Sequence, residues 1–328
     1  MSLRPTAEVQ QLVAAGRFAE AADRLKTAAA EGDPEALFML GGWRISGQVV
    51  ARDKAAARKL MGKASDAGHP TASLFYAHFL ANGTGGSSDW RKARQVLGTI
   101  ADQPAVAAQL AMLERMAVDE DGEPLSLPPL QTLSDRPRVF SACSFATSEE
   151  CDYLIRSSEP RLQPSVVTDR ATGRMIPHPD RKSDGAFFGV GYEDLVVNAI
   201  NRRIAAISET KPEHAEPLQI LRYGPGGEFR THFDFVRDGG NQRILTALIY
   251  LTNDYEGGET RFVRTGLDFR GRKGDLLLFR NVTEDGRQDE LSEHAGLPVK
   301  SGTKIVASRW IWRKPFSVEP PLPFVPGS

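Results

Sequence analysis

The chain is poor in cysteine, has no long apolar run and carries almost no net charge. Its two cysteines among 328 residues, Cys143 and Cys151, are too few for a disulfide-stapled secreted domain, so we expect free thiols in a reducing cytoplasm. No segment approaches the roughly 20 apolar residues of a membrane span, and no apolar signal segment opens the chain. The net charge of −1, with no basic excess in either part, argues against a nucleic-acid partner.

What is present suits an ordinary globular protein with one or two domains. Hydrophobic residues make up 41% of the chain and charged residues 25%, and the length allows a sizeable core. Changes in composition predict helical repeats over residues 1–120, a linker rich in acidic residues and proline over 121–138, a second domain over 139–316 and a proline-rich extended tail over 317–328.

An internal repeat with an offset of 36 residues runs through the alanine-rich first third. The offset aligns six residue pairs in one register: Gly32 with Gly68, Pro34 with Pro70, Ala36 with Ala72, Gly47 with Gly83, Asp53 with Asp89, and Ala57 with Ala93. A period of this length is typical of paired helices stacked into a solenoid. A partial third copy, with Ala108 one period after Ala72, is expected to end near Met116.

The repeated stretch AAAEGDPEALFMLGGWRISGQVVARDKAAARKLM resembles the SEL-type, tetratricopeptide-like repeat over about residues 16–116. The resemblance implies an array that presents a groove to a protein partner. The alternative is a small solenoid that only packs against the next domain.

Strand-like runs dominate the chain after Val139. VFSACSF, LQILRY, RILTALIYL, DLLLF and IVASRWIW suit a sheet sandwich or barrel. Two helices interrupt them: TSEECDYLIRSS, capped by Thr147 or Ser148, and LVVNAINRRIAAIS over residues 195–208.

A metal site is the main functional hypothesis. His232 and Asp234 are one residue apart, and on a strand they would project from the same face. With His294 they complete the two-histidine, one-carboxylate set of non-haem Fe(II) oxygenases, which leaves coordination positions open for a 2-oxo acid and dioxygen. Lys304, beyond a turn at Ser301–Gly302, could pair with the far carboxylate of 2-oxoglutarate.

Four motifs follow one another around this site: His-x-Asp, RILTALIYLTNDYEGGETRF, KGDLLLF and SEHAGLPVKSGTK. Their order resembles that of the prolyl 4-hydroxylase branch of the Fe(II)/2-oxoglutarate-dependent oxygenases over about residues 139–314. The resemblance implies a double-stranded β-helix (jelly-roll) with flanking helices. The expected fold class is therefore α+β with two domains, an N-terminal helical repeat solenoid and this C-terminal jelly-roll. The resemblance also implies Fe(II), 2-oxoglutarate and dioxygen as cofactors, with ascorbate as a further one.

Individual roles follow from the same resemblance. It implies iron ligation and catalysis by His232, Asp234 and His294, and binding of 2-oxoglutarate by Lys304, Tyr223 and Thr260. It places four residues at the substrate: Arg243, Trp310, Trp312 and Arg181. The other histidines, His69, His78, His178 and His214, lie outside the triad pattern.

Two departures from the branch bear on the substrate. Ile305 follows the distal lysine where Trp is common, and Trp312 stands where peptide-hydroxylating members often carry His. The polar stretch 168–188 is a candidate lid in which Arg181 and Ser183 could touch substrate, or else an ordinary surface connection.

Three functions remain open. The first is hydroxylation of a residue in a peptide or protein, such as proline, on a target recruited by the repeats. The second is hydroxylation of a free amino acid or other small metabolite. The third is a partner-binding scaffold without catalysis. Neither nucleic acid nor membrane is expected as a partner, and the expected location is the cytoplasm.

Overall fold

The structure is a computed structural model that describes residues 5–168, 175–236 and 240–316. The expected proline-rich tail and residues 169–174 of the candidate lid lie outside the described residues. Of the described residues, one compact unit contains 5–122 and 190–198, and the other contains the remaining residues from Glu123 to Phe316. No helix in the described ranges is long and apolar enough to cross a membrane.

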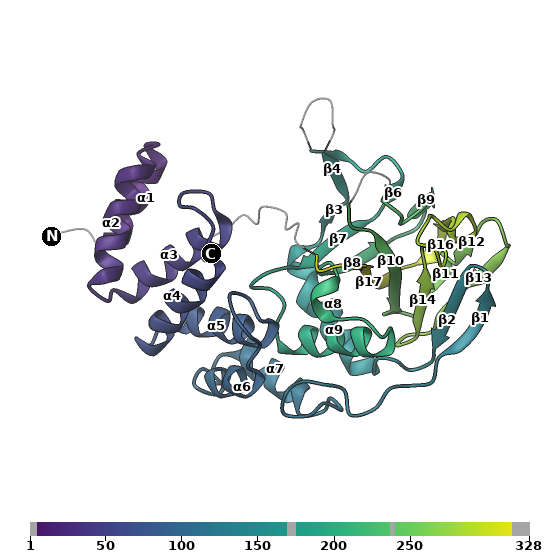
Figure 1. Cartoon of the computed structure of the whole chain (residues 1–328), viewed down its shortest axis with the longest axis horizontal. Coiled ribbons are helices and arrows are strands. Elements are labelled where there is room, and N and C mark those ends of the chain that lie inside the picture. Colours follow the sequence, from purple (N-terminus) through teal and green to yellow (C-terminus); the bar gives the residue numbers. More distant parts are fainter. Residues whose placement is uncertain (1–4, 169–174, 237–239, 317–328) are drawn as a thin grey trace. The chain divides into compact units, whose positions relative to one another are not determined.

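The first unit is built from consecutive antiparallel helices (Figure 1). They are α1 (Pro5–Ala14), α2 (Phe18–Ala30), α3 (Pro34–Ser46), α4 (Lys54–Asp66), α5 (Pro70–Asn82), α6 (Trp90–Gly98) and α7 (Pro104–Leu113). Residues 190–198, which include the first turn of a later helix, α9 (Leu195–Ile207), belong to this unit.

The pairs that share the 36-residue register occupy equivalent places in successive helical hairpins. Pro34 and Pro70 are the first residues of α3 and α5, where a missing N–H costs nothing. Gly47 and Gly83 end the same helices with φ of 72° and 75°, a left-handed cap that favours glycine. The remaining pairs serve in the same way: Asp53 and Asp89 cap α4 and α6, Gly32 and Gly68 turn with positive φ, and Ala36, Ala72, Ala57 and Ala93 are fully buried.

The expected register of the third copy is wrong by two residues. Pro104 begins α7, as Pro70 begins α5, so the spacing here is 34 residues. The buried counterpart of Ala72 is therefore Val106, which is 1% exposed, whereas Ala108 is exposed. The shorter spacing comes from α6, which has 9 residues where α4 has 13, so α7 begins earlier even though the connection before it is longer.

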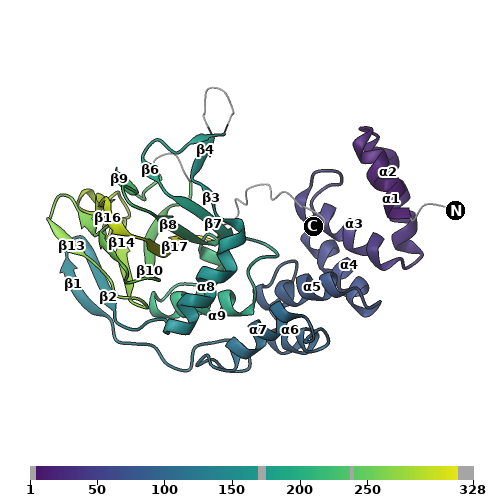
Figure 2. The same cartoon turned by 180° about the vertical axis from the view of Figure 1, so that it is seen from behind.

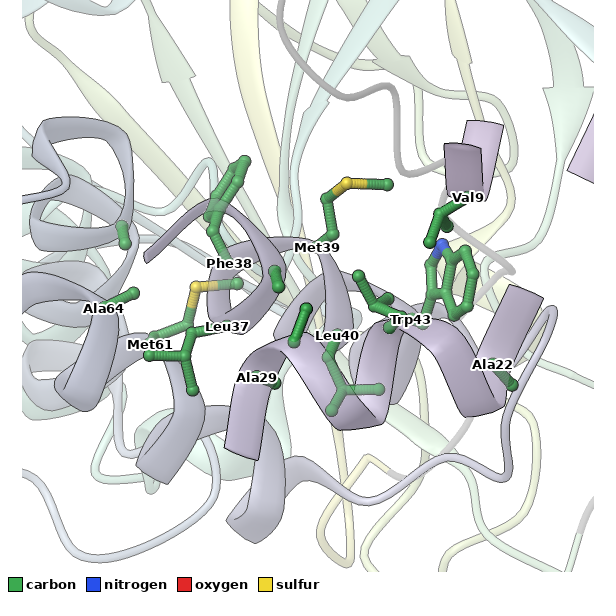
Figure 3. Close-up of a cluster of buried hydrophobic side chains, with 14 of the residues drawn as sticks. Val9, Ala22, Ala29, Leu37, Phe38, Met39, Leu40, Trp43, Met61 and Ala64 are labelled. Carbon is green, nitrogen blue, oxygen red and sulfur yellow. The ribbon is translucent and has the colours of Figure 1, made fainter. Parts of the chain in front are cut away.

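Apolar side chains from several helices form the core of the first unit (Figure 3). Leu37 and Leu40 of α3 lie with Met61 of α4 and Val9 of α1, all at most 7% exposed. Burial of each such side chain contributes roughly 1.5–3 kcal/mol, so the stack is held by packing between neighbouring helices.

The second unit contains two main sheets, seen from both sides in Figures 1 and 2. The larger runs β1-β2-β14-β10-β17-β8-β7-β3 and the smaller runs β13-β12-β15-β9-β6. The larger sheet contains β1 (Gln131–Asp135), β2 (Arg138–Ala142), β3 (Gln163–Pro164), β7 (Asp184–Phe188), β8 (Leu218–Tyr223), β10 (Arg243–Tyr250), β14 (Leu276–Arg280) and β17 (Lys304–Trp312). The smaller contains β6 (Arg181–Lys182), β9 (Glu228–His232), β12 (Thr260–Phe262), β13 (Leu267–Phe269) and β15 (His294–Gly296).

Short elements complete this unit. Two further sheets have two antiparallel strands each: β4 (Val166–Thr168) pairs with β5 (Met175–Pro177), and β11 (Tyr255–Gly257) pairs with β16 (Val299–Gly302). The helices are α8 (Ser148–Ser158), α9, and the 3-10 turns Glu159–Arg161, Pro212–His214 and Glu290–Ser292. Thr147 caps α8 in a capping box with Glu150, as expected for one of the two candidate caps. The helical-repeat unit and the two-sheet β unit with flanking helices confirm the expected α+β fold class.

The sheet begins earlier than the change of composition at Val139 indicated. Strand β1 lies inside the stretch expected to be a linker, 121–138, and pairs antiparallel with β2 at the edge of the larger sheet. Its burial pattern is mostly exposed, because an edge strand has one neighbour, and its polar sequence QTLSD gave no strand signal.

Candidate active site

The two histidines of the proposed triad lie opposite each other on neighbouring strands. His232 ends β9, His294 begins β15, and the two are register partners in this antiparallel pair. The ring of His232 is tied by a 2.7 Å contact from Nδ1 to the carbonyl of Arg230, and that of His294 by a 2.9 Å contact to the carbonyl of Ser292. Each Nδ1 must donate to its carbonyl, which leaves each Nε2 with a lone pair free to bind a metal.

Asp234 completes the group, although it does not lie on a strand as expected. Strand β9 ends at His232, and Asp234 follows in a bend. Its carboxylate still lies 3.6 Å from Nε2 of His232 and 3.6 Å from Nε2 of His294. One ligand atom from each residue lies within 4.8 Å of the others, so the three can hold one metal ion.

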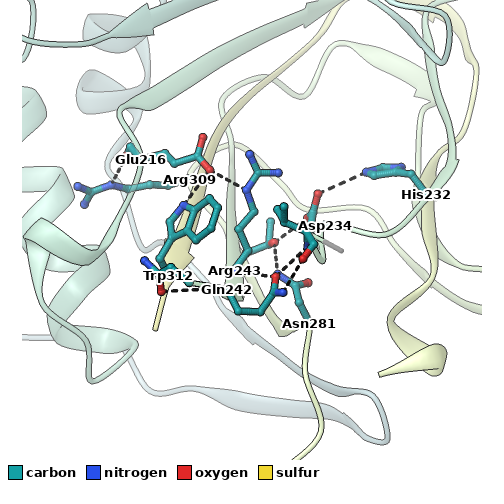
Figure 4. A network of polar contacts seen from close by, with 11 residues as sticks. Glu216, His232, Asp234, Gln242, Arg243, Asn281, Arg309 and Trp312 are labelled. Carbon is teal, nitrogen blue, oxygen red and sulfur yellow. Dashed lines mark hydrogen bonds and ion pairs between the residues drawn. The ribbon is translucent and has the colours of Figure 1, made fainter. Parts of the chain in front are cut away.

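A polar chain behind Asp234 fixes its orientation (Figure 4). Thr246 on β10 donates to Oδ2 of Asp234 at 2.6 Å, and the amide of Asn281 donates to the Thr246 hydroxyl at 3.0 Å. All three side chains are at most 4% exposed. Because a buried carboxylate tolerates few orientations when hydrogen-bonded in this way, the carboxylate stays directed at the histidines, Oδ1 toward His232 and Oδ2 toward His294.

The charges of the triad suit a cation. Burial opposes ionisation of Asp234, but the facing imidazoles of His294 and His232 outweigh it and hold its pKa well below the usual range. Burial, together with the neighbouring His232, lowers the pKa of His294 to about 4. The site therefore offers a carboxylate and neutral imidazole at neutral pH, the protonation states that metal ligands need.

Lys304 is a buried cation on the floor of the same site. It is 5% exposed, and its Nζ donates to the carbonyl of Gly258 at 2.6 Å and lies over the rings of Tyr223 and Tyr250. Within the ranges that the structure describes, no carboxylate pairs with it. Burial lowers its pKa to about 8, against a smaller opposing effect of Glu259. A desolvated ammonium without a counter-ion fits an anionic ligand.

Two hydroxyl groups accompany Lys304. Tyr223 on β8 is the register partner of Lys304 on β17, and burial raises its pKa to about 12, so the phenol keeps its proton. Thr260 on β12 is 2% exposed and shares a 2.8 Å hydrogen bond with the hydroxyl of Tyr250. Both can donate to a carboxylate held by the lysine.

These residues line one cavity between the two sheets. The larger sheet contributes Lys304, Tyr223 and Trp310, and the smaller sheet contributes His232, His294 and Thr260. Asp234 also lines the cavity, and four apolar residues form part of its wall: Leu221, Phe229, Leu248 and Val306. The cavity thus brings together the proposed iron ligands, the 2-oxoglutarate residues and one of the four proposed substrate residues.

Arg243 and Trp312 lie in a polar network beside that cavity, not in its wall (Figure 4). Nε of Arg243 donates to Glu216 at 2.6 Å, and Nε1 of Trp312 donates to the same carboxylate oxygen at 2.9 Å. The guanidinium of Arg243 lies 4.0 Å from the centre of the Trp310 ring. Arg243 therefore packs on the indole of Trp310, which does line the cavity.

Arg181 and Ser183 lie near Tyr223. The guanidinium of Arg181 is 5.4 Å from the centre of the Phe229 ring, and Ser183 hydrogen-bonds to Tyr223 and to Ser165. Neither residue lines the metal cavity. Both line a second cleft beside it.

Sequence reasoning missed the residues that support the ligands. Thr246 is the one hydroxyl in the apolar strand RILTALIY apart from the terminal Tyr250, and both proved to be hydrogen-bonded to site residues. A hydroxyl side chain in the middle of an otherwise apolar strand was a sequence signal that could have indicated a residue supporting the site. Asn281 and Glu216 carry no comparable signal, because each reaches the site only through the fold.

This geometry is that of an oxygenase class with a two-histidine, one-carboxylate site that can hold iron and a buried lysine that can bind an anionic co-substrate. Residues 218–312 match the 2OG-Fe(II) oxygenase superfamily. Prolyl 4-hydroxylase 1 of Arabidopsis thaliana is 35% identical over 223 residues, which span 62% of this chain and 79% of that protein. The chain belongs to the prolyl 4-hydroxylase family of these oxygenases and uses Fe(II), 2-oxoglutarate and dioxygen.

Solved structures are also similar in part. A viral collagen prolyl hydroxylase from Paramecium Bursaria Chlorella virus-1, in a 2OG complex, is 29% identical, covers 53% of this chain and 95% of that chain, and has a TM-score of 0.44. A Sel1 repeat protein from Oxalobacter formigenes is 22% identical, covers 28% of this chain and 39% of that chain, and has a TM-score of 0.27.

Proposed function

We propose that this oxygenase hydroxylates a prolyl residue of a peptide or protein, with iron held by His232, Asp234 and His294. The single observation that carries the site assignment is the convergence of the three ligands and Lys304 on one cavity. The relatives named prolyl 4-hydroxylases support the choice of residue. The intact ligand set and the membership of an enzyme family argue against a scaffold without catalysis.

The bound cofactors and the residues of the site have different roles in the proposed reaction. Bound iron, with 2-oxoglutarate and dioxygen, supplies the oxidising power that hydroxylates an unactivated C–H bond and yields succinate and carbon dioxide. Lys304, Tyr223 and Thr260 bind the far carboxylate of 2-oxoglutarate and so fix its orientation. The pinned histidine rings hold their lone pairs toward one point, and the apolar wall limits water.

Trp310 supports a peptide substrate. Its indole Nε1 is buried and has no hydrogen-bond partner among the described residues. The ring is braced by Arg243 and lines the cavity, so its N–H is a fixed donor. A peptide carbonyl beside the target residue would satisfy it.

The second candidate is a free amino acid or other small metabolite. Trp312 stands where peptide-hydroxylating members of the branch often carry histidine, and its Nε1 donates to Glu216 beside the cavity. The chain therefore lacks a side chain that is common in enzymes acting on peptides.

The deciding experiment is mass spectrometry of a native lysate incubated with the enzyme, Fe(II) and 2-oxoglutarate. Peptides that gain one oxygen atom at proline, and do not gain it with His232→Ala, support the proposal. Oxygen gained only by small molecules would contradict it and favour the second candidate. Added ascorbate should raise total turnover, since we propose it as a further cofactor.

We also propose that the helical repeats recruit the target protein in the cytoplasm. If they do, an intact target protein should show a lower KM than a short peptide cut from around its hydroxylated residue, with similar kcat. Equal KM values for the protein and the peptide would contradict recruitment.

A further inference from the structure

A second cleft, here called the Arg181 cleft, lies beside the metal cavity and shares no lining residue with it. Its volume is about 350 Å³. Its lining includes His178, Arg181, Lys182, Asp184 and Arg222. Strand β6, the end of β8 and the glycine-rich turn at 224–227 build most of it.

The charge in this cleft is positive. Asp184 is its one carboxylate, and it is already engaged by Arg222, which donates to Oδ2 at 2.7 Å. Neither Arg181 nor Lys182 has an ion-pair partner in the part of the chain that the structure describes. The cleft therefore carries two cations that form no ion pair with a described residue.

Arg181 is the more unusual of these two. The residue is 8% exposed, and its Nε is buried without a hydrogen-bond partner among the described residues. An unpaired guanidinium is costly to bury, because it loses water and gains no acceptor in return. A bound carboxylate would supply that acceptor in the two-pronged geometry that arginine favours.

His178 adds a neutral donor. Its Nδ1 accepts from the backbone N–H groups of Asp180 and Arg181, both at 3.1 Å. A neutral imidazole that accepts at Nδ1 carries its hydrogen on Nε2. The cleft thus offers an ammonium, a guanidinium and an imidazole N–H, all of which suit an anionic oxygen group.

The Arg181 cleft is separated from a metal ligand by one aromatic ring. Arg181 and Phe229 are register partners on β6 and β9, and the guanidinium lies over the Phe229 ring. The same ring stacks on His232 with centroids 3.6 Å apart. The guanidinium of Arg181 is 5.4 Å from the Phe229 ring centre and that centre is 3.6 Å from the His232 ring centre, so the path from Arg181 to His232 is at most about 9 Å. An extended peptide advances about 3.3–3.6 Å per residue, so two or three residues span that distance.

We propose that the Arg181 cleft binds a carboxylate of the peptide substrate, two or three residues from the residue that is hydroxylated. This inference rests on the proposed peptide substrate. It gives the enzyme a preference for target prolines with an acidic neighbour at that spacing, and the carboxylate pairs with Arg181, Lys182 and the imidazole of His178.

The test is peptide binding to the full chain loaded with Fe(II) and 2-oxoglutarate without oxygen, so that affinity is read independently of turnover. The probes are proline-centred nonapeptides with blocked ends and a single Glu at each position in turn, each matched to the same peptide with Gln. A further pair has a free or an amidated C-terminus placed two or three residues after the proline.

We expect Glu to bind about three- to tenfold more tightly than Gln at one position two or three residues from proline, and about equally elsewhere. Lys182→Glu should abolish or reverse that ratio, while Lys211→Glu, the same charge change on an exposed residue outside the cleft, should keep it. A matching preference for the free C-terminus would support the cleft and identify the chain end as a second source of the carboxylate.

Two results would overturn the inference: no charge preference at any position, or a preference that survives in Lys182→Glu. Oxygen admitted afterwards separates this inference from the proposed function. If acidic peptides bind with the expected preference but none gains oxygen at proline, the cleft assignment stands and prolyl hydroxylation is contradicted.

Discussion

His232 and His294 are direct cross-strand partners, and each ring is held by the carbonyl two residues before it in the chain. The same local contact is used on two different strands, so the pair presents two Nε2 atoms to one point without any other side chain. Asp234 reaches that point from outside the strand, and its position depends instead on Thr246 and Asn281.

Thr246→Val should weaken iron binding while the fold persists. It removes the 2.6 Å hydrogen bond to Asp234 at nearly constant volume, and loss of such a supporting contact typically costs about 10- to 100-fold in metal affinity. The measurement is Fe(II) affinity by competition with a chelator in the absence of oxygen. Thr246→Ser keeps the hydroxyl and should restore most of the affinity; equal values for Val, Ser and wild type would argue against the contact.

Lys304→Met should raise the KM for 2-oxoglutarate about 100-fold or more without lowering the melting temperature. The substitution removes the cation that pairs with the far carboxylate, and a buried unpaired charge contributes little to stability. Steady-state kinetics and thermal melting of the same samples provide the two readouts. An unchanged KM would refute the role of Lys304, and a large fall in melting temperature would show that it serves the fold.

Affinity for 2-oxoglutarate should be flat below pH 8 and fall above it. Burial lowers the pKa of Lys304 from 10.5 to about 8, and the ligand binds the ammonium form, so each further pH unit removes more of the competent species. Between pH 8 and 10.5 the unfolded chain holds a proton that the ligand-free folded chain has lost, so this group makes the free energy of unfolding rise with pH.

The pH dependence is checked by titrating 2-oxoglutarate into the Fe(II) protein across pH 6.5–9.5. Lys304→Arg, which stays charged throughout, is the matched control and should flatten the decline above pH 8. A decline of the same size in the arginine variant would assign the pH dependence to another group.

Asp89→Ala should destabilise α6 by about 1 kcal/mol. The side chain of Asp89 accepts from the backbone N–H of Lys92, which has no partner inside the helix. Native-state hydrogen exchange in α6 measures the loss. Asp89→Asn keeps an acceptor oxygen and should retain most of the protection; identical exchange in the alanine variant and wild type would contradict the capping role.

The sequence predicted what local patterns determine. The 36-residue register corresponds to caps, first-turn prolines and buried alanines, each of which depends on a few neighbouring residues. The triad and Lys304 were identified from spacing and from the ordered motifs, and the structure brings them to one cavity.

What depended on long-range pairing was not predicted. Strand β1 is polar and forms only because β2 lies beside it. Asn281, just after β14, supports Asp234 through Thr246 on β10, although Asn281 and Asp234 are 47 positions apart. Glu216, just before β8, accepts hydrogen bonds from Arg243 on β10 and Trp312 on β17. The Arg181 cleft likewise exists only once β6 has paired with β9.

The central claim is that one cavity binds Fe(II) through three side chains and then 2-oxoglutarate. Anaerobic calorimetric titration of 2-oxoglutarate, with and without Fe(II), into the wild-type chain and into Asp234→Ala tests it most directly. We predict one 2-oxoglutarate bound per chain, tight only with Fe(II), and loss of that dependence together with Fe(II) binding in the variant. Equal binding with and without Fe(II), or unchanged Fe(II)-dependent binding in Asp234→Ala, would contradict it.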